Sequence, residues 1–472
     1  MLRPPWQRRA ALSTSEALSE DLSGGRWVRA MRSIQIVGGG LAGSEAAWQA
    51  AQLGVPVTLF EMRPHIMTPA HRTAWLAELV CSNSLGSNLP DRASGLLKNE
   101  LRSLGSVIMA CADRSAVPAG GALAVGREAF AAAVTDAVAS HPLVSLRREE
   151  VQLIPRDGAV VLATGPLTSD RLAEDIGKLA GEEHLYFYDA MAPIVRVETV
   201  DMTRAFRASR YGRGGDDYIN CPMTEAEYNR FVDELVAAET IALRDFERED
   251  KRFFEACLPV EVLAARGREA LAFGPLKPVG LVDPRSGERP YAVVQLRQDN
   301  LAGTLYNLVG FQTNLMWSEQ RRVFRLIPGL EDAEFVRYGQ MHRNTFVNAP
   351  ALINATMECR QRSGLFFGGQ ITGTEGYIAS TCSGYVAGLN AARTMLGRGL
   401  LVFPDTTMIG ALCHYVASAP SEGFQPMKPN FGLLPPIGGR RMGKRQRHQV
   451  LARRALSDLR RFAIDHALVP AT

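Results

Sequence analysis

Residues 33–64 constrain the fold more than any other part of this 472-residue chain. An apolar run, Ile34 to Val37, leads into the loop Gly38-Gly39-Gly40-Leu41-Ala42-Gly43. An alanine-rich helical pattern follows, and a second apolar run, Val57 to Phe60, is closed by Glu61. This order predicts a strand, a helix and a second strand, which is a complete βαβ unit. We therefore expect an α/β fold built on a Rossmann-like domain.

The loop between the first strand and the helix has the spacing of a dinucleotide-binding site. Gly38 allows the tight turn out of the strand, Gly40 lets the backbone approach a pyrophosphate, and Gly43 lets helix and strand pack closely. The helix N-terminus offers unpaired N–H groups to the phosphates. Glu61, at the end of the second strand, stands where an acid accepts a hydrogen bond from a ribose hydroxyl. These features in register favour dinucleotide binding over a glycine turn that binds nothing. The predicted binding residues here are Gly38, Gly39, Gly40, Leu41, Ala42, Gly43 and Glu61.

The length of the chain exceeds what one hydrophobic core usually serves, so we expect more than one domain.

No apolar run is long enough to span a membrane. Residues 1–30 contain Arg and Ser but no continuous apolar core of a secretory signal. We expect them to be a disordered extension, or the product of an early start codon with Met31 as the natural beginning.

The seven cysteines are scattered, without CxxC pairs. This pattern argues against a zinc site and against a disulfide framework, so we expect no metal and a cytoplasmic protein. A buried, inert thiol is the default for any one of them.

Positive charge is concentrated near the C-terminus. Between Arg440 and Arg461 there are nine Lys or Arg and one acid, Asp458, whereas the rest of the chain has a slight excess of acids. A basic tail on an acidic body can hold a polyanion such as nucleic acid by counterion release. A solvated terminal helix is the alternative.

The middle of the chain predicts a domain inserted into the first one. Two strands, 144–153 and 159–163, end at Thr164-Gly165-Pro166, and a strand that stops at Ala-Thr-Gly is typical of two-dinucleotide-binding flavoproteins. From 189 to 335 aromatic and β-branched runs alternate with helical patterns, which indicates α+β structure. We thus predict an FAD-binding domain in two parts, 31–188 and 336–472, around an inserted domain, 189–335.

Two further segments bear on a site. The polar region 68–105, with LVCSNSLGSN, is predicted to be an exposed loop leading to a helix over 93–104. Residues 364–393 predict a strand, a glycine turn and a small-residue helix whose N-terminus can face a flavin or pyrophosphate. A tight strand-to-helix turn without a ligand is the alternative for GGQITGTEGY.

Several motifs together closely resemble one family, the folate- and FAD-dependent tRNA uracil-5-methyltransferases. The resemblance covers the chain from about Ser33 to the C-terminus. Its motifs are GGGLAGSE (38–45), AELVCSNS (77–84), VPAGGALAV (117–125), ATGPLTS (163–169), LYFYD (185–189), YINCPMT (218–224), FFEACLPVEV (253–262), FGPLKPVGL (273–281), residues 291–307 and QITGTEGY (370–377).

The resemblance implies a flavoenzyme that methylates C5 of the T-loop uridine of tRNA, position 54. The carbon would come from 5,10-methylenetetrahydrofolate, and reduced FAD, regenerated by NADH or NADPH, would supply the electrons. It implies tRNA and folate as partners, with no membrane and no stable protein partner.

The resemblance also assigns roles to single residues. Uracil C5 becomes nucleophilic when a thiolate adds at C6, so the chemistry needs a reactive cysteine. By motif position Cys257 in FFEACLP is that nucleophile, and Cys81 in LVCSNS is a supporting or resolving thiol near the flavin. Cys221 is interpreted as structural and the other four as core residues. The flavin site is extended by motif position to Gly165, Gly369, Gln370, Glu375, Gly376 and Tyr377.

Three positions depart from the family pattern. Gly86 stands where Arg is common, Gly126 where Asp is common, and Ala379 where Glu is usual. Two other functions stay open, and the three departures bear on the second of them. One is the related FAD- and folate-dependent enzyme that modifies the wobble uridine of tRNA, which carries a longer helical C-terminal domain. The other is a flavin-holding tRNA-binding protein without catalysis.

Overall fold

The computed structural model describes residues 33–181, 185–190, 192–241, 258–339, 341–438 and 442–468, and for 185–190 and 341–345 the backbone alone. The predicted disordered extension, residues 1–30, lies outside this range. Within it, no helix is both long and apolar enough to cross a membrane.

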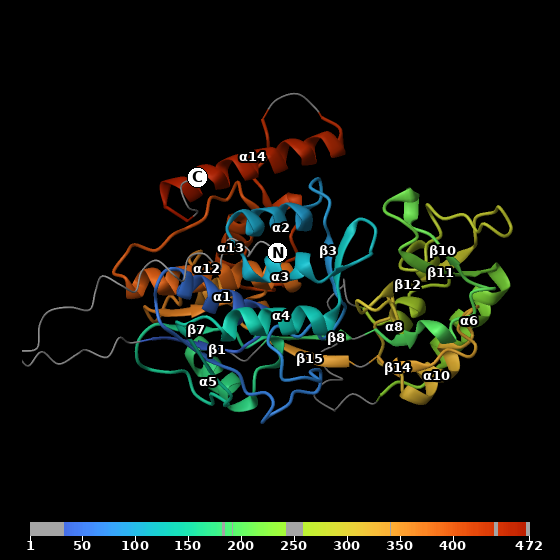
Figure 1. Ribbon diagram of the computed structural model, residues 1–472, viewed down its shortest axis with the longest axis horizontal. Helices are drawn as coiled ribbons and strands as arrows, with labels where there is room; N and C mark the ends of the chain where they lie inside the picture. The colour runs from blue at the N-terminus through green and yellow to red at the C-terminus, as the bar shows by residue number, and fades with distance from the viewer. Residues whose placement is uncertain are drawn as a thin grey trace, which may run out of the picture. The chain divides into compact units, whose positions relative to one another are not determined.

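A five-stranded parallel sheet carries the glycine loop (Figure 1). Its strands in spatial order are β16 (Leu365–Phe367), β7 (Val160–Leu162), β1 (Ile34–Val37), β2 (Val57–Phe60) and β6 (Val144–Arg147). The predicted βαβ unit is present, with β1 and β2 parallel and in register from Ile34↔Val57 to Val37↔Phe60. Strands β7 and β16 lie far apart in the sequence and pair in parallel. The C-terminal part of the chain thus completes the sheet that the N-terminal part begins.

Helices α1 (Leu41–Gln52) and α12 (Tyr377–Met395) pack against each other at unusually close range. A Cβ placed on Gly384 would lie 2.5 Å from the Cα of Ala42, and one on Gly388 would lie 2.4 Å from the Cα of Ala46. Two glycines a turn apart therefore let the two backbones touch, because any larger residue would hold the helices apart. Both helices begin at the same edge of the sheet.

Further helices cover this sheet and share its hydrophobic core. They are α2 (Ala93–Ser103), α3 (Val107–Arg114), α4 (Arg127–Ala139), α5 (Asp170–Ala180), α11 (Ala349–Leu352), α13 (Met408–Ser418) and α14 (Lys444–Asp465). The basic segment predicted as a tail is mostly α14. Its buried residues Leu451, Ala455, Leu459 and Ala463 recur every fourth position and pack toward α2, while most of its charges face outward.

The segment predicted as an exposed loop around LVCSNSLGSN is instead packed. Strands β3 (Ser84–Ser87), β5 (Ala122–Val125) and β4 (Ala116–Val117) form a small antiparallel sheet that the sequence analysis missed. Asn83, just before β3, is fully buried. The prediction failed because the contacts that bury this polar stretch come from distant parts of the chain.

The residues between the two parts of the first domain form a second domain with its own hydrophobic core. Its six-stranded antiparallel sheet has the order β10 (Phe206–Arg207), β11 (Tyr218–Met223), β12 (Ala292–Gln298), β13 (Leu305–Leu308), β9 (Ile194–Arg196) and β14 (Phe335–Arg337). Figure 1 shows these strands grouped with α6 (Glu225–Ala237), α8 (Val260–Ala265) and α10 (Trp317–Phe324), and α9 (Ala270–Phe273) follows α8. The predicted fold class, a Rossmann-like domain with an inserted α+β domain, is confirmed.

The chain enters and leaves the inserted domain along one pair of strands. Strand β8 (Leu185–Ala190) precedes β9, and β15 (Met341–Phe346) follows β14. These two strands pair with each other in antiparallel register, from Met341↔Ala190 to Phe346↔Leu185. The two chain segments that connect the inserted domain to the first domain therefore lie side by side as paired strands.

Candidate functional site

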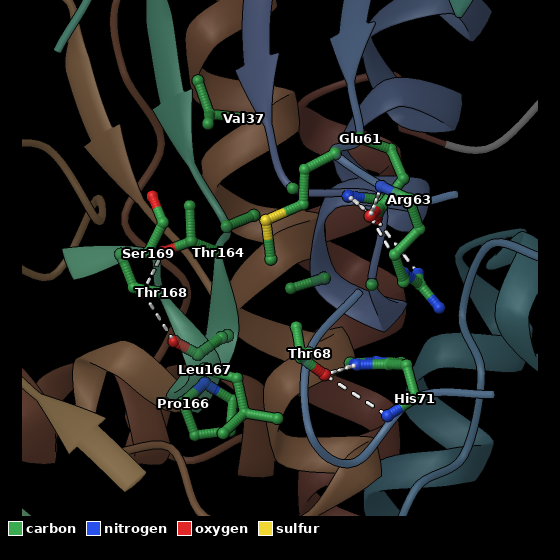
Figure 2. A pocket seen from close by; sticks show the side chains of 18 of the residues that line it. Val37, Glu61, Arg63, Thr68, His71, Thr164, Pro166, Leu167, Thr168 and Ser169 are labelled. Carbon is green, nitrogen blue, oxygen red and sulfur yellow. Dashed lines mark hydrogen bonds and ion pairs between the residues drawn. The ribbon is translucent and has the colours of Figure 1, made fainter. Parts of the chain in front are cut away.

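A pocket opens at the carboxyl ends of β1, β2 and β7, where α/β sheets bind their ligands. It encloses about 1020 Å³ of empty space, including the solvent at its mouth. Figure 2 shows part of its lining. Glu61 and Arg63 lie on one side, with Thr68 and His71 below them in the view, and the opposite side carries Thr164, Pro166, Leu167, Thr168 and Ser169. Its place beside the glycine loop, at the carboxyl ends of these strands, is where α/β sheets of this kind bind dinucleotides.

The glycine loop lies along this pocket, and its glycines are needed for different reasons. Gly38 has a φ of +103°, and a Cβ there would be 2.5 Å from the carbonyl oxygen of Ala163. A Cβ on Gly43 would be only 1.8 Å from the carbonyl oxygen of Gly38. A Cβ on Gly40, by contrast, would meet no atom within 4 Å. Gly38 and Gly43 therefore serve the fold, and Gly40 keeps open the space where a pyrophosphate would approach the start of α1.

Glu61 is buried at the pocket wall in a dense set of hydrogen bonds. Its carboxylate accepts from the backbone N–H of Gly39 at 3.0 Å and from Nε and Nη2 of Arg63 at 2.9 and 3.0 Å. The N–H of Arg63 adds a further bond at 3.0 Å. Burial alone would raise the pKa of Glu61, but the hydrogen bonds and charge of Arg63 outweigh burial and lower it. The carboxylate thus stays ionised as an acceptor and also holds the glycine loop in place.

The other wall contains the flavin-site residues predicted from the later motifs. Gly165, Gly369, Gln370 and Tyr377 line the pocket, together with Leu41 and Ala42 from α1. Gly43, Glu375 and Gly376 stand beside it without lining it. Nε2 of Gln370 donates to Glu375 at 2.8 Å, so the two residues act as a unit. Four further residues line the pocket and were not predicted: Thr68, His71, Glu149 and Glu150. They lie in irregular segments, and no motif marks them.

Of the two predicted cysteines, only Cys81 lies within the described residues, and Cys257 lies outside them. Cys81 is half-buried, and its backbone N–H donates to the hydroxyl of Tyr377 at 2.8 Å. Val80, its neighbour, lines the pocket. Cys81 is thus held beside the pocket wall. The other described cysteines are buried, which agrees with their interpretation as core residues: Cys111, Cys221, Cys359, Cys382 and Cys413.

Three arginines donate hydrogen bonds to residues 79–83, here called the Cys81 loop. Arg127 donates to the carbonyl oxygens of Leu79 at 2.5 Å and Cys81 at 3.1 Å, and Arg337 donates to that of Val80 at 3.1 Å. Arg297 donates to the side chains of Asn83 at 3.0 Å and Ser82 at 3.1 Å. We call Arg127, Arg297 and Arg337 the arginine clamp.

The arginine clamp links the Cys81 loop to the inserted domain. Arg297 lies on β12 and Arg337 on β14, whereas Arg127 starts α4 and pairs with buried Asp299 at 2.9 Å. Burial disfavours the charge of Arg127, but the carboxylate of Asp299 more than compensates, and the pKa of Arg127 lies above its usual value. No sequence signal marks Arg127 or Arg337, because their partners are distant backbone carbonyls.

The three departures from the family pattern have structural settings. Gly86 adopts a φ of +80° in β3, close to Ser94 and Lys98, where a side chain would be strained. Gly126 caps α4 without a side-chain bond, and a Cβ there would lie 2.9 Å from Leu301. Ala379 is buried in the first turn of α12. None of the three lines the pocket.

A second cavity encloses about 1760 Å³ of empty space, including the solvent at its mouth, and the charged residues that line it are mainly basic. We call it the basic groove. Its described lining contains five cations and one carboxylate, Asp91, which pairs with Arg445 at 3.4 Å. The cations are Arg92, Arg213, Lys444, Arg445 and Arg453. Among the described residues, no group of His, Cys, Asp and Glu is arranged to hold a metal ion.

Comparison with known proteins identifies the family. A family model described as "Glucose inhibited division protein A" matches residues 33–399. The chain belongs to this family. Within it, the chain is 61% identical over 427 residues to a protein of Desulforudis audaxviator named methylenetetrahydrofolate--tRNA-(uracil-5-)-methyltransferase TrmFO, covering 90% of this chain and 97% of that one. It is 59% identical over 439 residues to the protein of the same name from Symbiobacterium thermophilum, covering 93% and 98%.

Solved structures of this glucose inhibited division protein A family support the fold. Aquifex aeolicus GidA in one crystal form has a TM-score of 0.66 with this chain at 16% identity, covering 94% of this chain and 75% of that one. At this identity the likeness shows the shared fold alone. Three relatives in the family share 57–61% identity with the chain, and the match covers nearly the whole length of each.

Proposed function

We propose that this chain methylates C5 of the T-loop uridine, position 54, of tRNA, with 5,10-methylenetetrahydrofolate as carbon donor. The observation that carries the proposal is the identity of 59–61% to proteins named for this reaction, over almost their full length. The pocket described above supports it, because a dinucleotide there would end beside Tyr377 and the Cys81 loop. The same identity favours this reaction over wobble-uridine modification.

FAD fits the pocket on its own geometry. The space in front of Gly40 is open, the start of α1 faces it, and Glu61 stands at the end of β2. When bound and reduced, FAD supplies the electrons that convert a methylene to a methyl group. Gly38 to Gly43 and Glu61 would hold its pyrophosphate and ribose, and Gly165, Gly369, Gln370 and Tyr377 would face the remainder. NADH or NADPH would regenerate the reduced form.

The protein's own chemical contribution is the activation of uracil. In this proposal the thiolate of Cys257 adds to C6, and the π electron pair of the C5=C6 double bond moves toward O4. C5 then bonds to the folate-derived methylene carbon and loses its proton, and the thiolate leaves as the C5=C6 double bond reforms. The electrons of the reduced flavin would replace the bond between this carbon and the folate nitrogen, which leaves a methyl group on C5 and releases tetrahydrofolate. Cys81, held by the arginine clamp and Tyr377, is the supporting thiol. The substrate places the reaction in the cytoplasm.

The decisive experiment is incubation of the purified protein with unmodified tRNA, methylenetetrahydrofolate and NADPH, followed by nucleoside analysis. We expect 5-methyluridine at the T-loop position. FAD reduction without 5-methyluridine would contradict the proposal and favour a flavin-holding tRNA-binding protein.

Replacing Cys257 by Ala should abolish formation of 5-methyluridine while FAD stays bound at wild-type stoichiometry. The physical reason is that C5 of uracil is too weak a nucleophile without addition at C6. Nucleoside analysis measures the loss, and the flavin absorbance spectrum measures cofactor content. Cys221→Ala, at a buried core thiol, is the matched control and should retain activity wherever it folds. Full activity in Cys257→Ala would disprove the assignment.

The basic groove offers a surface for the tRNA backbone. Replacing Arg213 and Arg453 together by Gln should weaken tRNA binding and lower the slope of log Kd against log salt by about 2, because each lost phosphate contact removes about one released counterion. Filter binding at several salt concentrations measures this slope.

Charge substitution is a sharper test than deletion of α14, since deletion would remove core residues such as Leu451 and Leu459 and uncover the face of α2 on which they pack. The matched control is Arg460→Gln with Arg461→Gln, which removes the same number of charges outside the groove, from the helix that also carries Arg453. An equal change of slope in both double variants would show that the groove is not the binding surface.

A further inference from the structure

Three aromatic rings of the inserted domain form a stack that ends at the surface. The ring of Phe335 lies 5.8 Å from that of Tyr338 at an interplanar angle of 15°. Tyr338 in turn lies 6.0 Å from Trp317 at 20°. Trp317 is 57% exposed. We call Phe335, Tyr338 and Trp317 the aromatic ladder; its outermost ring presents a flat face to solvent.

The inner end of the aromatic ladder is fixed in the domain core. Phe335 packs on Phe324 at 6.3 Å, and Phe324 packs edge-on against Phe311 at 5.3 Å. Phe324 and Phe311 are fully buried. The exposed indole is therefore supported by a rigid column of rings, so that little conformational freedom would be lost when another planar group stacks on it.

A cation lies at the edge of the ladder. Arg321, one turn after Trp317 on α10, donates from Nε to the hydroxyl of Tyr338 at 3.0 Å, and its guanidinium lies 5.9 Å from the ring centroid. The nearby carboxylate of Glu319 is bound by Arg322, at 2.7 Å. Among the described residues no carboxylate forms an ion pair with Arg321. An aromatic face beside a cation suits a nucleobase next to its phosphate.

The ladder is joined to the segment that carries Cys257. Residues 312–316, directly before Trp317, accept backbone hydrogen bonds from the described residues on both sides of 242–257. The N–H of Ile241 donates to the carbonyl oxygen of Asn314 at 2.9 Å, and the N–H of Val260 to that of Gln312 at 2.7 Å. Both ends of the Cys257 segment are thus anchored on the strand-like run that leads into the ladder.

We propose that the exposed face of Trp317 stacks an unpaired base of the tRNA loop adjacent to the target uridine, with Arg321 next to its phosphate. This inference rests on the proposed function and assigns it a substrate-recognition site. A rigid, flat aromatic face with a cation at its edge binds any base through its π-face and is suited to loop nucleotides, whose bases are unstacked.

The test compares Trp317→Ala and Trp317→Phe, with Val236→Ala as the control for an exposed apolar residue of the same domain. With a T-arm hairpin as substrate, Trp317→Ala should raise KM about tenfold, with kcat within about twofold. Trp317→Phe should lie between Trp317→Ala and wild type, and Val236→Ala should match wild type. The salt slope should stay unchanged, because stacking releases no counterions, which separates this effect from that of the basic groove.

A second measurement does not depend on methylation. The difference in tryptophan fluorescence between wild type and Trp317→Phe should be quenched by the hairpin, and much less by a hairpin with an abasic nucleotide beside the target. Equal quenching by both hairpins, or an unchanged KM in Trp317→Ala, would overturn the inference. So would a loss of thermal stability in Trp317→Ala with no change in KM, since it would show that the face is covered by this chain or a second copy. Failure of the proposed function would instead show as absence of 5-methyluridine in the wild-type protein.

Discussion

Gly40→Ala should yield a protein that folds normally but binds FAD more weakly, whereas Gly43→Ala should be strongly destabilised. A methyl group on Gly43 would lie 1.8 Å from the carbonyl oxygen of Gly38, so β1 and α1 must move apart. We expect the free energy of unfolding to fall by about 3 kcal/mol or more. A methyl group on Gly40 meets no protein atom, and the unfolding free energy should change by less than about 0.5 kcal/mol.

The two variants separate the fold from the ligand. In Gly40→Ala the methyl group occupies the space of the approaching pyrophosphate, and FAD affinity should fall by about 10- to 100-fold. Urea unfolding of the apoprotein measures stability, and flavin fluorescence titration measures affinity. Gly399→Ala is the control, because a Cβ there also meets no atom and the residue does not line the pocket. Wild-type FAD affinity in Gly40→Ala would show that the phosphates do not pass this residue.

Arg127→Met should destabilise the protein and strongly reduce methylation. It leaves the carboxylate of Asp299, which is 4% exposed, without its guanidinium partner, at a cost of about 3 kcal/mol. It also releases the carbonyl groups of Leu79 and Cys81. A displacement of the Cys81 loop by about 1 Å should lower kcat about a hundredfold. Thermal unfolding and the rate of 5-methyluridine formation measure the two effects.

A double variant distinguishes stability from positioning. Adding Asp299→Asn to Arg127→Met removes the orphaned charge, and most of the lost stability should return. Activity should stay low, because the loop carbonyls still lack their donor. Arg127→Lys, which keeps the charge but not the forked donor geometry, should recover activity only in part. Recovery of full activity together with stability in the double variant would mean that the arginine clamp has a structural role alone.

The sequence predicted best what is encoded locally. The βαβ unit was identified because strand, glycine loop, helix and Glu61 follow each other directly along the chain and each uses a short-range signal. The same holds for the strand, turn and helix that end in α12. Gly165, Gly369, Gln370 and Tyr377, assigned by motif position from the family resemblance, line the pocket, and their contact with a flavin stays a prediction. In each case the motif itself contains the residues that shape the site.

The predictions that failed or fell short depend on distant contacts. The Cys81 loop looks exposed from its polar composition, yet its carbonyls are held by Arg127 and Arg337, 46 and 257 residues away from their acceptors. The small sheet of β3, β4 and β5 is too short to give a periodic signal. The helix α14 carried a signal, the apolar residues 451, 455, 459 and 463, which its many charges obscured. Charge alone could not distinguish a packed helix from a tail.

The touching backbones of α1 and α12 have a consequence for how the protein matures on the ribosome. Gly384 and Gly388 are made late in synthesis, yet they contact Ala42 and Ala46 near the start of the chain, and β16 joins the sheet from the same late segment. Until that segment leaves the exit tunnel, α1 lacks its neighbour and the nucleotide pocket lacks a wall. We therefore expect flavin to bind only after this late segment has been synthesised, and truncated chains that end before α12 should be recovered colourless.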